Sequence, residues 1–196
     1  MERYLRPLAR YALEAVDRHY QRHHALQPVG PVLFVSRGIY RGSAIRFEDG
    51  TRLGPNDTIG VLHFNNARIS CLQASSATAA ARAFTRLMRS SLRHLAERSR
   101  HDPAFSDLAV YHGITWLPPH GSSAGFLTSP LPQTLETRLR SRYFRLLLWT
   151  FAPVPRSRMA ATTPNNYFLT RTALLSRNPA PSQPAGNPPG SVVSSG

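Results

Sequence analysis

The chain has 196 residues, which is long enough for one domain with a proper hydrophobic core and too short for two. Its formal net charge is +14, and all 24 basic residues are arginine. A chain without lysine cannot carry a Walker A phosphate loop or a lysine Schiff base, and the single cysteine, Cys71, excludes an internal disulfide and any multi-cysteine metal site.

The positive charge favours an anionic partner. The complete replacement of lysine by arginine is typical of a compositional bias of the source genome, but the field it creates still attracts an anionic ligand, an anionic membrane surface or nucleic acid. The sequence shows no signal-peptide pattern, and its longest apolar run, 146–152, is far shorter than the roughly 20 residues of a transmembrane helix. We therefore expect a cytoplasmic protein without a transmembrane segment, and a peripheral position at the membrane stays open.

The first half of the chain is predicted to contain one helix and then short strands. Apolar residues at helical spacing, with arginines opposite them, predict an amphipathic helix over residues 2–24. From residue 31 the period changes to that of strands separated by turns. The strands are expected at 32–35, 44–47 and 51–53, and the turns at 38–42, 48–50 and 54–56.

The stretch 57–66 reads as a buried strand that ends in uncharged polar residues. With a two-residue period, Ile59, Val61, His63 and Asn65 share one face. Both faces are largely apolar, so we expect an interior strand. An unpaired buried polar group costs about 1–3 kcal/mol, and His63 and Asn65 should therefore have hydrogen-bond partners.

The stretch 107–116 repeats this design. Val110, His112 and Ile114 fall on one face of the predicted strand. If the two strands pair or lie one apart, His63 and His112 face a shared pocket. The alternative, which the sequence leaves open, is that each is a core histidine with its own partner.

The remaining elements complete an α+β protein, with a mixed or antiparallel sheet packed against about three helices. A helix is predicted from residue 75 or 76 to residue 100, followed later by a loop, a brief strand, a third helix and a closing strand or hairpin. These later elements are expected at 118–125, 126–128, 134–152, and 158–161 with 166–170. We expect a single domain over 1–177 and a disordered tail over 178–196, which is rich in proline, serine and glycine.

Two catalytic motifs are weakly supported. Residues 121–125 match the G-x-S-x-G nucleophile elbow by letter, but prolines stand before them where that elbow needs a strand. A triad in the order His63, Asp107, Ser123 stays formally open.

A metal site is also weakly supported. It would have to combine His63, His112 and His120, with Asp57 or Asp107, and none of these lies at a tight ligand spacing. We predict no metal site, and the sequence indicates no particular cofactor.

Neutral polar groups beside aromatic residues and arginines suit the binding of a polar, anionic ligand. The predicted ligand-binding residues are His63, Asn65, Asn66, His112, Thr115 and Trp116. Asn165 is expected to add a hydrogen bond, and Tyr167 is an alternative to Trp116 as a stacking face.

Several of these segments together resemble the YkoP-like family, which is uncharacterised. The resemblance is carried by residues 40–42, 48–50, 56–66 and 112–115, and its most specific part is Leu62-His-Phe-Asn65. It covers about residues 1–177. The family includes stand-alone bacterial proteins and domains attached to some polysaccharide deacetylases, which implies an association with the cell envelope. No activity, catalytic residue or cofactor follows from the resemblance.

Three functions remain as hypotheses, and the sequence does not decide whether the protein is an enzyme. The first is an accessory domain that binds a polar, anionic cell-envelope ligand in a pocket centred on His63, Asn65 and His112. The second is a small hydrolase or transferase with His63 or His112 as general base. The third is nucleic-acid binding, which rests on charge alone because no helix-turn-helix, zinc-finger or RNA-binding motif is legible.

Overall fold

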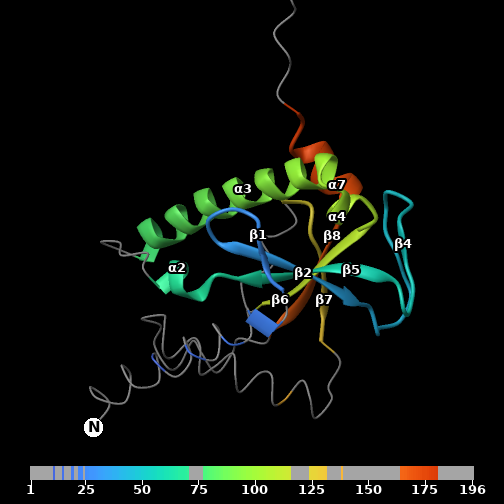
Figure 1. Cartoon of the computed structure of the whole chain (residues 1–196), viewed down its shortest axis with the longest axis horizontal. Helices are drawn as coiled ribbons and strands as arrows, with labels where there is room; N and C mark the ends of the chain where they lie inside the picture. The colour runs from blue at the N-terminus through green and yellow to red at the C-terminus, as the bar shows by residue number, and fades with distance from the viewer. Residues whose placement is uncertain are drawn as a thin grey trace, which may run out of the picture.

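The fold is seen in a computed structural model of the chain (Figure 1). The structure describes residues 25–70, 77–115, 124–131 and 164–180, together with isolated positions 11, 15, 19, 22, 23 and 138. The predicted helices at 2–24 and 134–152, the predicted strand at 158–161, most of the loop at 118–125 and most of the predicted tail lie outside the described residues.

The described elements are short strands and helices of very different length. The strands are β1 (Gln27–Pro28), β2 (Leu33–Ile39), β3 (Ile45–Arg46), β4 (Arg52–Leu53), β5 (Thr58–Phe64), β6 (Val110–Thr115), β7 (Leu127–Pro130) and β8 (Asn165–Thr170). The helices are α2 (Asn66–Ser70), α3 (Ala77–His101), α4 (Pro103–Ser106) and α7 (Arg171–Arg177).

Six strands form one sheet in the order β1-β2-β5-β6-β8-β7, and β3 and β4 form a separate hairpin. Strands β5 and β6 run parallel, and all other neighbouring pairs of this sheet are antiparallel. The connection between β5 and β6 contains α2, α3 and α4, as expected for a parallel pair, which needs a long crossover. The predicted α+β class with a mixed sheet is confirmed, and β5 is an interior strand as predicted.

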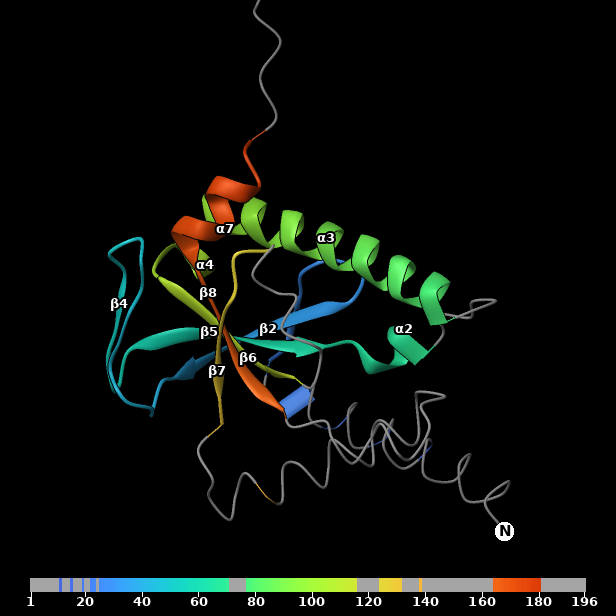
Figure 2. The same ribbon diagram turned by 180° about the vertical axis from the view of Figure 1, so that it is seen from behind.

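One face of the sheet, here called the helix face, packs against α3, α4 and α7 (Figures 1 and 2). The sheet supplies alternate residues such as Leu33, Val35, Tyr111 and Leu169, because successive side chains of a strand point to opposite faces. The helices and their connections supply Leu92, Leu95, Ala96, Phe105, Leu108 and Leu174. This is the larger of the two described apolar cores.

The opposite face, here called the hairpin face, is covered at one end by the β3–β4 hairpin. Ile59, Val110 and Phe168 of the sheet pack there against Phe47 and Leu53 of the hairpin. The edge-to-face contact of Phe47 with Phe168, at 6.3 Å between ring centroids, belongs to this second core. His63 and His112 lie on the same face, further along their strands.

One prediction about β2 is wrong. Residues 38–42 were expected to form a turn-rich link, but β2 continues through Gly38 to Ile39 and pairs with β5 along its whole length. A Cβ atom on Gly38 would lie 2.6 Å from Cγ2 of Val61. The glycine is therefore in the strand because the neighbouring valine leaves no room for a side chain.

Within the part of the chain that the structure describes, no helix is both long and apolar enough to cross a membrane.

Candidate functional site

The two predicted histidines are brought together on the hairpin face. The parallel register pairs Val61 of β5 with His112 of β6, so His63 lies two residues beyond the partner of His112 on the adjacent strand. With about 4.8 Å between strands and about 3.3 Å per residue, their Cα atoms are roughly 8 Å apart. Both side chains are half-buried. The two strands pair, which is one of the two arrangements in which the histidines were expected to face a shared pocket.

The imidazole of His63 is held by a serine on the strand to its other side. Nε2 of His63 lies 3.0 Å from Oγ of Ser36 in β2. Ser36 is buried, with 9% of its surface exposed. The hydroxyl can donate to this nitrogen or accept from it, depending on which ring nitrogen carries the proton.

The imidazole of His112 is held by β8 in two ways. Its Nε2 lies 3.0 Å from Oδ1 of Asn166, and because this oxygen can only accept, the ring nitrogen is the donor. The ring also stacks on Phe168, with 4.7 Å between centroids and 19° between planes. Phe168 is the cross-strand partner of His112, so the strand register fixes the plane of the ring.

The four polar residues Ser36, His63, His112 and Asn166 form what we call the histidine row, which crosses strands β2, β5, β6 and β8. Two members are uncharged side chains, Ser36 and Asn166, and two are imidazoles. The described strand residues beside them on this half of the face are apolar or neutral: Phe34, Val61, Ile114, Phe168, Leu127 and Ser129. Pre-positioned donors and acceptors of this kind can bind hydroxyl and phosphate oxygens.

The asparagines after β5 have a different position from the one predicted. Oδ1 of Asn65 accepts from the backbone N–H of Arg68 at 3.0 Å, and its carbonyl accepts from Ile69. Asn65 is therefore the N-cap of α2, and Asn66 is the first residue of that helix rather than the end of the strand. The cap oxygen is engaged by the backbone, and the amide nitrogen of Asn65 is the donor that can contact a ligand.

Thr115, Asn165 and Tyr167 lie on the helix face, opposite to the histidine row. Alternation along β6 separates Thr115 from His112, and Thr115 pairs with Asn165 of β8. Tyr167 makes an edge contact with Phe126 at 6.1 Å between centroids. The aromatic ring that stacks on a histidine is thus Phe168, the neighbour of the predicted Tyr167. Trp116 lies outside the described residues.

The two acids considered for a catalytic or metal role have their partners outside the histidine row. Asp57 precedes β5, six residues and about 20 Å from His63, and its Oδ2 accepts from the backbone N–H of Gly54 at 2.6 Å. Asp107 forms a two-pronged ion pair with Arg37, whose Nη1 lies 2.8 Å from Oδ1. This hydrogen-bonded guanidinium lowers the pKa of Asp107.

The described residues contain no cluster of three or more histidine, cysteine or acidic side chains that could hold a metal ion. His120 and Ser123, which the metal and triad alternatives need, lie outside the described residues.

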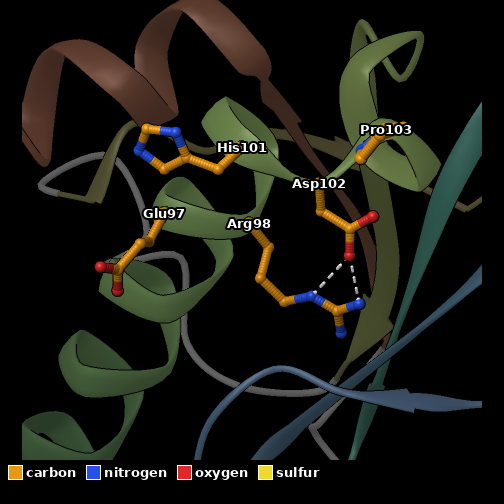
Figure 3. Close-up of a pocket in the computed structure, with 5 residues that line it drawn as sticks. All are labelled: Glu97, Arg98, His101, Asp102 and Pro103. Carbon is orange, nitrogen blue, oxygen red and sulfur yellow. Dashed lines mark hydrogen bonds and ion pairs between the residues drawn. The ribbon is translucent and has the colours of Figure 1, made fainter.

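A wide-open hollow lies elsewhere, between the end of α3 and the start of α4 (Figure 3). Its charged groups hold the fold together. Arg98 donates to the carboxylate of Asp102, with Nε 3.1 Å from Oδ2, and to Oε1 of Gln27 at 2.7 Å. Its guanidinium carbon also lies 4.4 Å from the ring centre of Phe105. Asp102 in turn caps α4 through the backbone N–H of Ala104.

Sequence reasoning missed Ser36 and Asn166, the two residues that hold the imidazoles. The signal for Ser36 was a polar residue directly after the apolar run 32–35, where the predicted strand was ended too early. The signal for Asn166 was its alternation with Phe168 and Thr170 along one face of the closing strand.

The comparisons with known proteins agree with the resemblance drawn from the sequence. The family model described as the YkoP domain matches residues 6–178, which is most of the chain. No significant match was found among curated proteins or among solved structures.

Proposed function

We propose that this chain, which belongs to the YkoP domain family, is an accessory domain that binds a polar, anionic ligand of the cell envelope. The observation that carries the proposal is the histidine row: His63 and His112 on adjacent strands, each with a ring nitrogen 3.0 Å from a neutral polar side chain. Rings held in this way lose little further freedom on binding, which favours affinity.

The anionic character of the ligand is supported by charge. The described strand residues around the histidine row include no carboxylate that would repel an anion. The chain as a whole has a net charge of +14, which raises the local concentration of anions. Amide N–H groups and protonated imidazole rings are donors that suit phosphate and carboxylate oxygens.

The cell-envelope part of the proposal rests on the expectation that related domains occur beside polysaccharide deacetylases. A sugar phosphate is therefore the appropriate probe, because it combines hydroxyl groups with an anion.

Calorimetric titration with N-acetylglucosamine 1-phosphate tests the proposal, with uncharged N-acetylglucosamine as the matched control ligand. We expect tighter binding of the phosphate, and a loss of affinity of about 10- to 150-fold in His63→Ala and in His112→Ala, since one hydrogen bond to a charged group contributes about 1.5–3 kcal/mol. His94→Ala, which removes an exposed imidazole from α3, should bind like the wild type.

Thermal melts of the same variants separate binding from folding. Both histidine variants should keep a cooperative melt. Loss of that cooperative melt in both variants would mean that the imidazoles are needed for folding and not for binding. Equal affinity for the charged and the neutral sugar would refute the preference for an anionic ligand.

A second function, hydrolysis or group transfer with an imidazole as general base, is favoured by one specific contact. Oγ of Ser36 and Nε2 of His63 have the separation of a nucleophile and its base, at 3.0 Å. In this reaction Oγ would form a bond to an electrophilic centre while its proton passes to Nε2, and the bond to the leaving group would break as Nε2 returns that proton to it. Water or an acceptor hydroxyl would then release the group from Oγ.

A fluorophosphonate probe tests the second function, because an activated serine displaces its fluoride and stays phosphonylated. Mass spectrometry should then find the label on Ser36 and not on the exposed Ser106, and His63→Ala should abolish it. Labelling or hydrolysis that survives the loss of both imidazoles would rule this function out.

A further inference from the structure

Four exposed arginines form a straight row on the outer side of α3. Arg82, Arg86, Arg89 and Arg93 follow one another at intervals of four, three and four residues, and all four are exposed. At about 100° per residue these positions fall within an arc of roughly 60°. At about 1.5 Å per residue the row is some 17 Å long. We call it the arginine row.

The charges of the arginine row are not neutralised by the described part of the protein. The first acidic residue of α3 is Glu97, beyond the last arginine of the row. Within the described residues, no hydrogen bond or ion pair joins the guanidinium group of any of the four to another group.

Two other arginines of the same helix show the contrast. Arg98 is paired with Asp102, and Arg100 donates to carbonyl groups at the end of α7, among them that of Leu175 at 3.4 Å. Arginines that stabilise the fold therefore stand at the C-terminal end of α3, and the row precedes them. Its charge is available to a partner.

The side of α3 that is fixed on the sheet lies roughly 50–150° around the helix from the middle of the row. Leu92, Leu95 and Ala96 of α3 belong to the core of the helix face. Helix α3, which carries the row, lies on the helix face of the sheet (Figures 1 and 2), and the histidine row lies on the hairpin face. The arginine row forms a second surface, independent of the proposed ligand site.

We propose that the arginine row binds the phosphate backbone of double-helical nucleic acid. A guanidinium group presents a planar fork of donors that matches phosphate oxygens, and four of them on a rigid helix match a rigid line of phosphates. Most contacts of proteins with duplexes are of this backbone type and carry no sequence information.

The side chains between the arginines favour a duplex over other polyanions. The exposed residues on this part of α3 include Thr78, Ala81 and Thr85, which are small enough to let a backbone approach. The described part of α3 exposes no large apolar side chain to insert into a membrane and no Phe, Tyr or Trp ring to stack on single-stranded bases.

Fluorescence anisotropy with a labelled 20-base-pair duplex tests the proposal over a salt series. Four phosphate contacts predict a slope of log K against log salt of about −3.6, which is a loss of about 150-fold between 50 and 200 mM salt. The double variant Arg86→Gln/Arg89→Gln should halve the slope to about −1.8 and reduce the loss to about 12-fold.

A matched control removes the same charge from another place. Arg46 and Arg52 are exposed cross-strand partners in the β3–β4 hairpin, and Arg46→Gln/Arg52→Gln should keep the wild-type slope. All of these residues are exposed, so circular dichroism melts should be unchanged in both double variants.

Three results would overturn the proposal. Equal losses of duplex affinity in the two double variants would mean that binding depends on net charge alone. An affinity that does not change across the salt series would exclude phosphate contacts. Row-dependent binding to vesicles containing phosphatidylglycerol, with duplex binding unaffected by the variants, would assign the surface to a membrane instead.

Discussion

Oγ of Ser36 lies 3.0 Å from Nε2 of His63, although the two residues are not cross-strand partners. The register pairs Ser36 with Val61 and His63 with Phe34, so the contact runs diagonally between β2 and β5 on the hairpin face. A diagonal contact of this kind depends on the exact register of the strands. It therefore connects the pairing of β2 with the orientation of the imidazole.

Removing the hydroxyl of Ser36 should destabilise the protein modestly. Ser36→Ala leaves the ring of His63 without this partner in a half-buried position, and we expect a loss of about 1 kcal/mol in the free energy of unfolding. Urea denaturation measures this loss. Ser106→Ala, at an exposed hydroxyl bonded only to the local carbonyl of Pro103, is the control and should change stability by less than about 0.5 kcal/mol. Equal values for both variants would show that the diagonal bond contributes nothing.

The capping position of Asn65 allows its structural and its binding roles to be separated. Asn65→Ala should lower the free energy of unfolding by about 1 kcal/mol, because Oδ1 no longer caps α2. Asn65→Asp keeps the cap oxygen and should keep the stability, but it lacks the amide donor and adds a negative charge.

Sugar-phosphate titration of both Asn65 variants then shows whether Asn65 also belongs to the ligand site. If Asn65 is part of the ligand site, Asn65→Asp should bind more weakly than the wild type although it is equally stable. Wild-type affinity in Asn65→Asp would remove this residue from the site and leave it as a helix cap.

The individual strands around the histidines were predictable because burial leaves a local pattern. The alternation of Ile59, Val61 and His63 placed β5 in the interior of the sheet, and that of Val110 and His112 repeated it. The length of α3 was likewise indicated by its apolar stripe and by the proline that begins α4. These patterns repeat every two or every 3.6 residues, so a short window of sequence contains them.

The partners of the histidines were not predictable in the same way. Pairing of Val61 with His112 joins residues that are far apart in the chain, and no local pattern records it. By its position Asn65 continued the alternation of the strand, but its side chain caps helix α2. The sequence did not distinguish the two positions, because asparagine is favoured both in turns after strands and at helix N-caps. Helix α7 was missed because its seven residues are too few to show a period, although Thr170 caps it.

The close approach of the β1–β2 turn to α3 should tolerate no side chain. Gly30 has a φ of +99°, and a Cβ atom there would lie 2.6 Å from Cα of Ser91. The hydroxyl of Ser91 also accepts from the backbone N–H of Val32 at 3.1 Å, so neither side can move away freely.

We expect Gly30→Ala to cost more than about 2 kcal/mol, from positive φ and steric overlap together. Gly50→Ala is a matched control, because its φ is +83° and no atom lies within 4 Å of the added Cβ. It should show only the backbone cost of about 1–2 kcal/mol. Urea denaturation of both variants checks this order, and equal losses would show that the turn can move away from α3.

The ion pair between Arg37 and Asp107 should make stability depend on pH in the acid range. The hydrogen-bonded guanidinium lowers the pKa of Asp107 in the folded protein, so the pair stabilises the fold above the unfolded pKa of about 3.9. This contribution should disappear as the pH falls through the folded pKa. The Tm difference between the wild type and Asp107→Asn, measured by calorimetry, should therefore be constant above about pH 5 and shrink below pH 4. The Tm difference between the wild type and Arg37→Gln should shrink in the same way at acid pH. A Tm difference that does not change with pH would contradict the pairing.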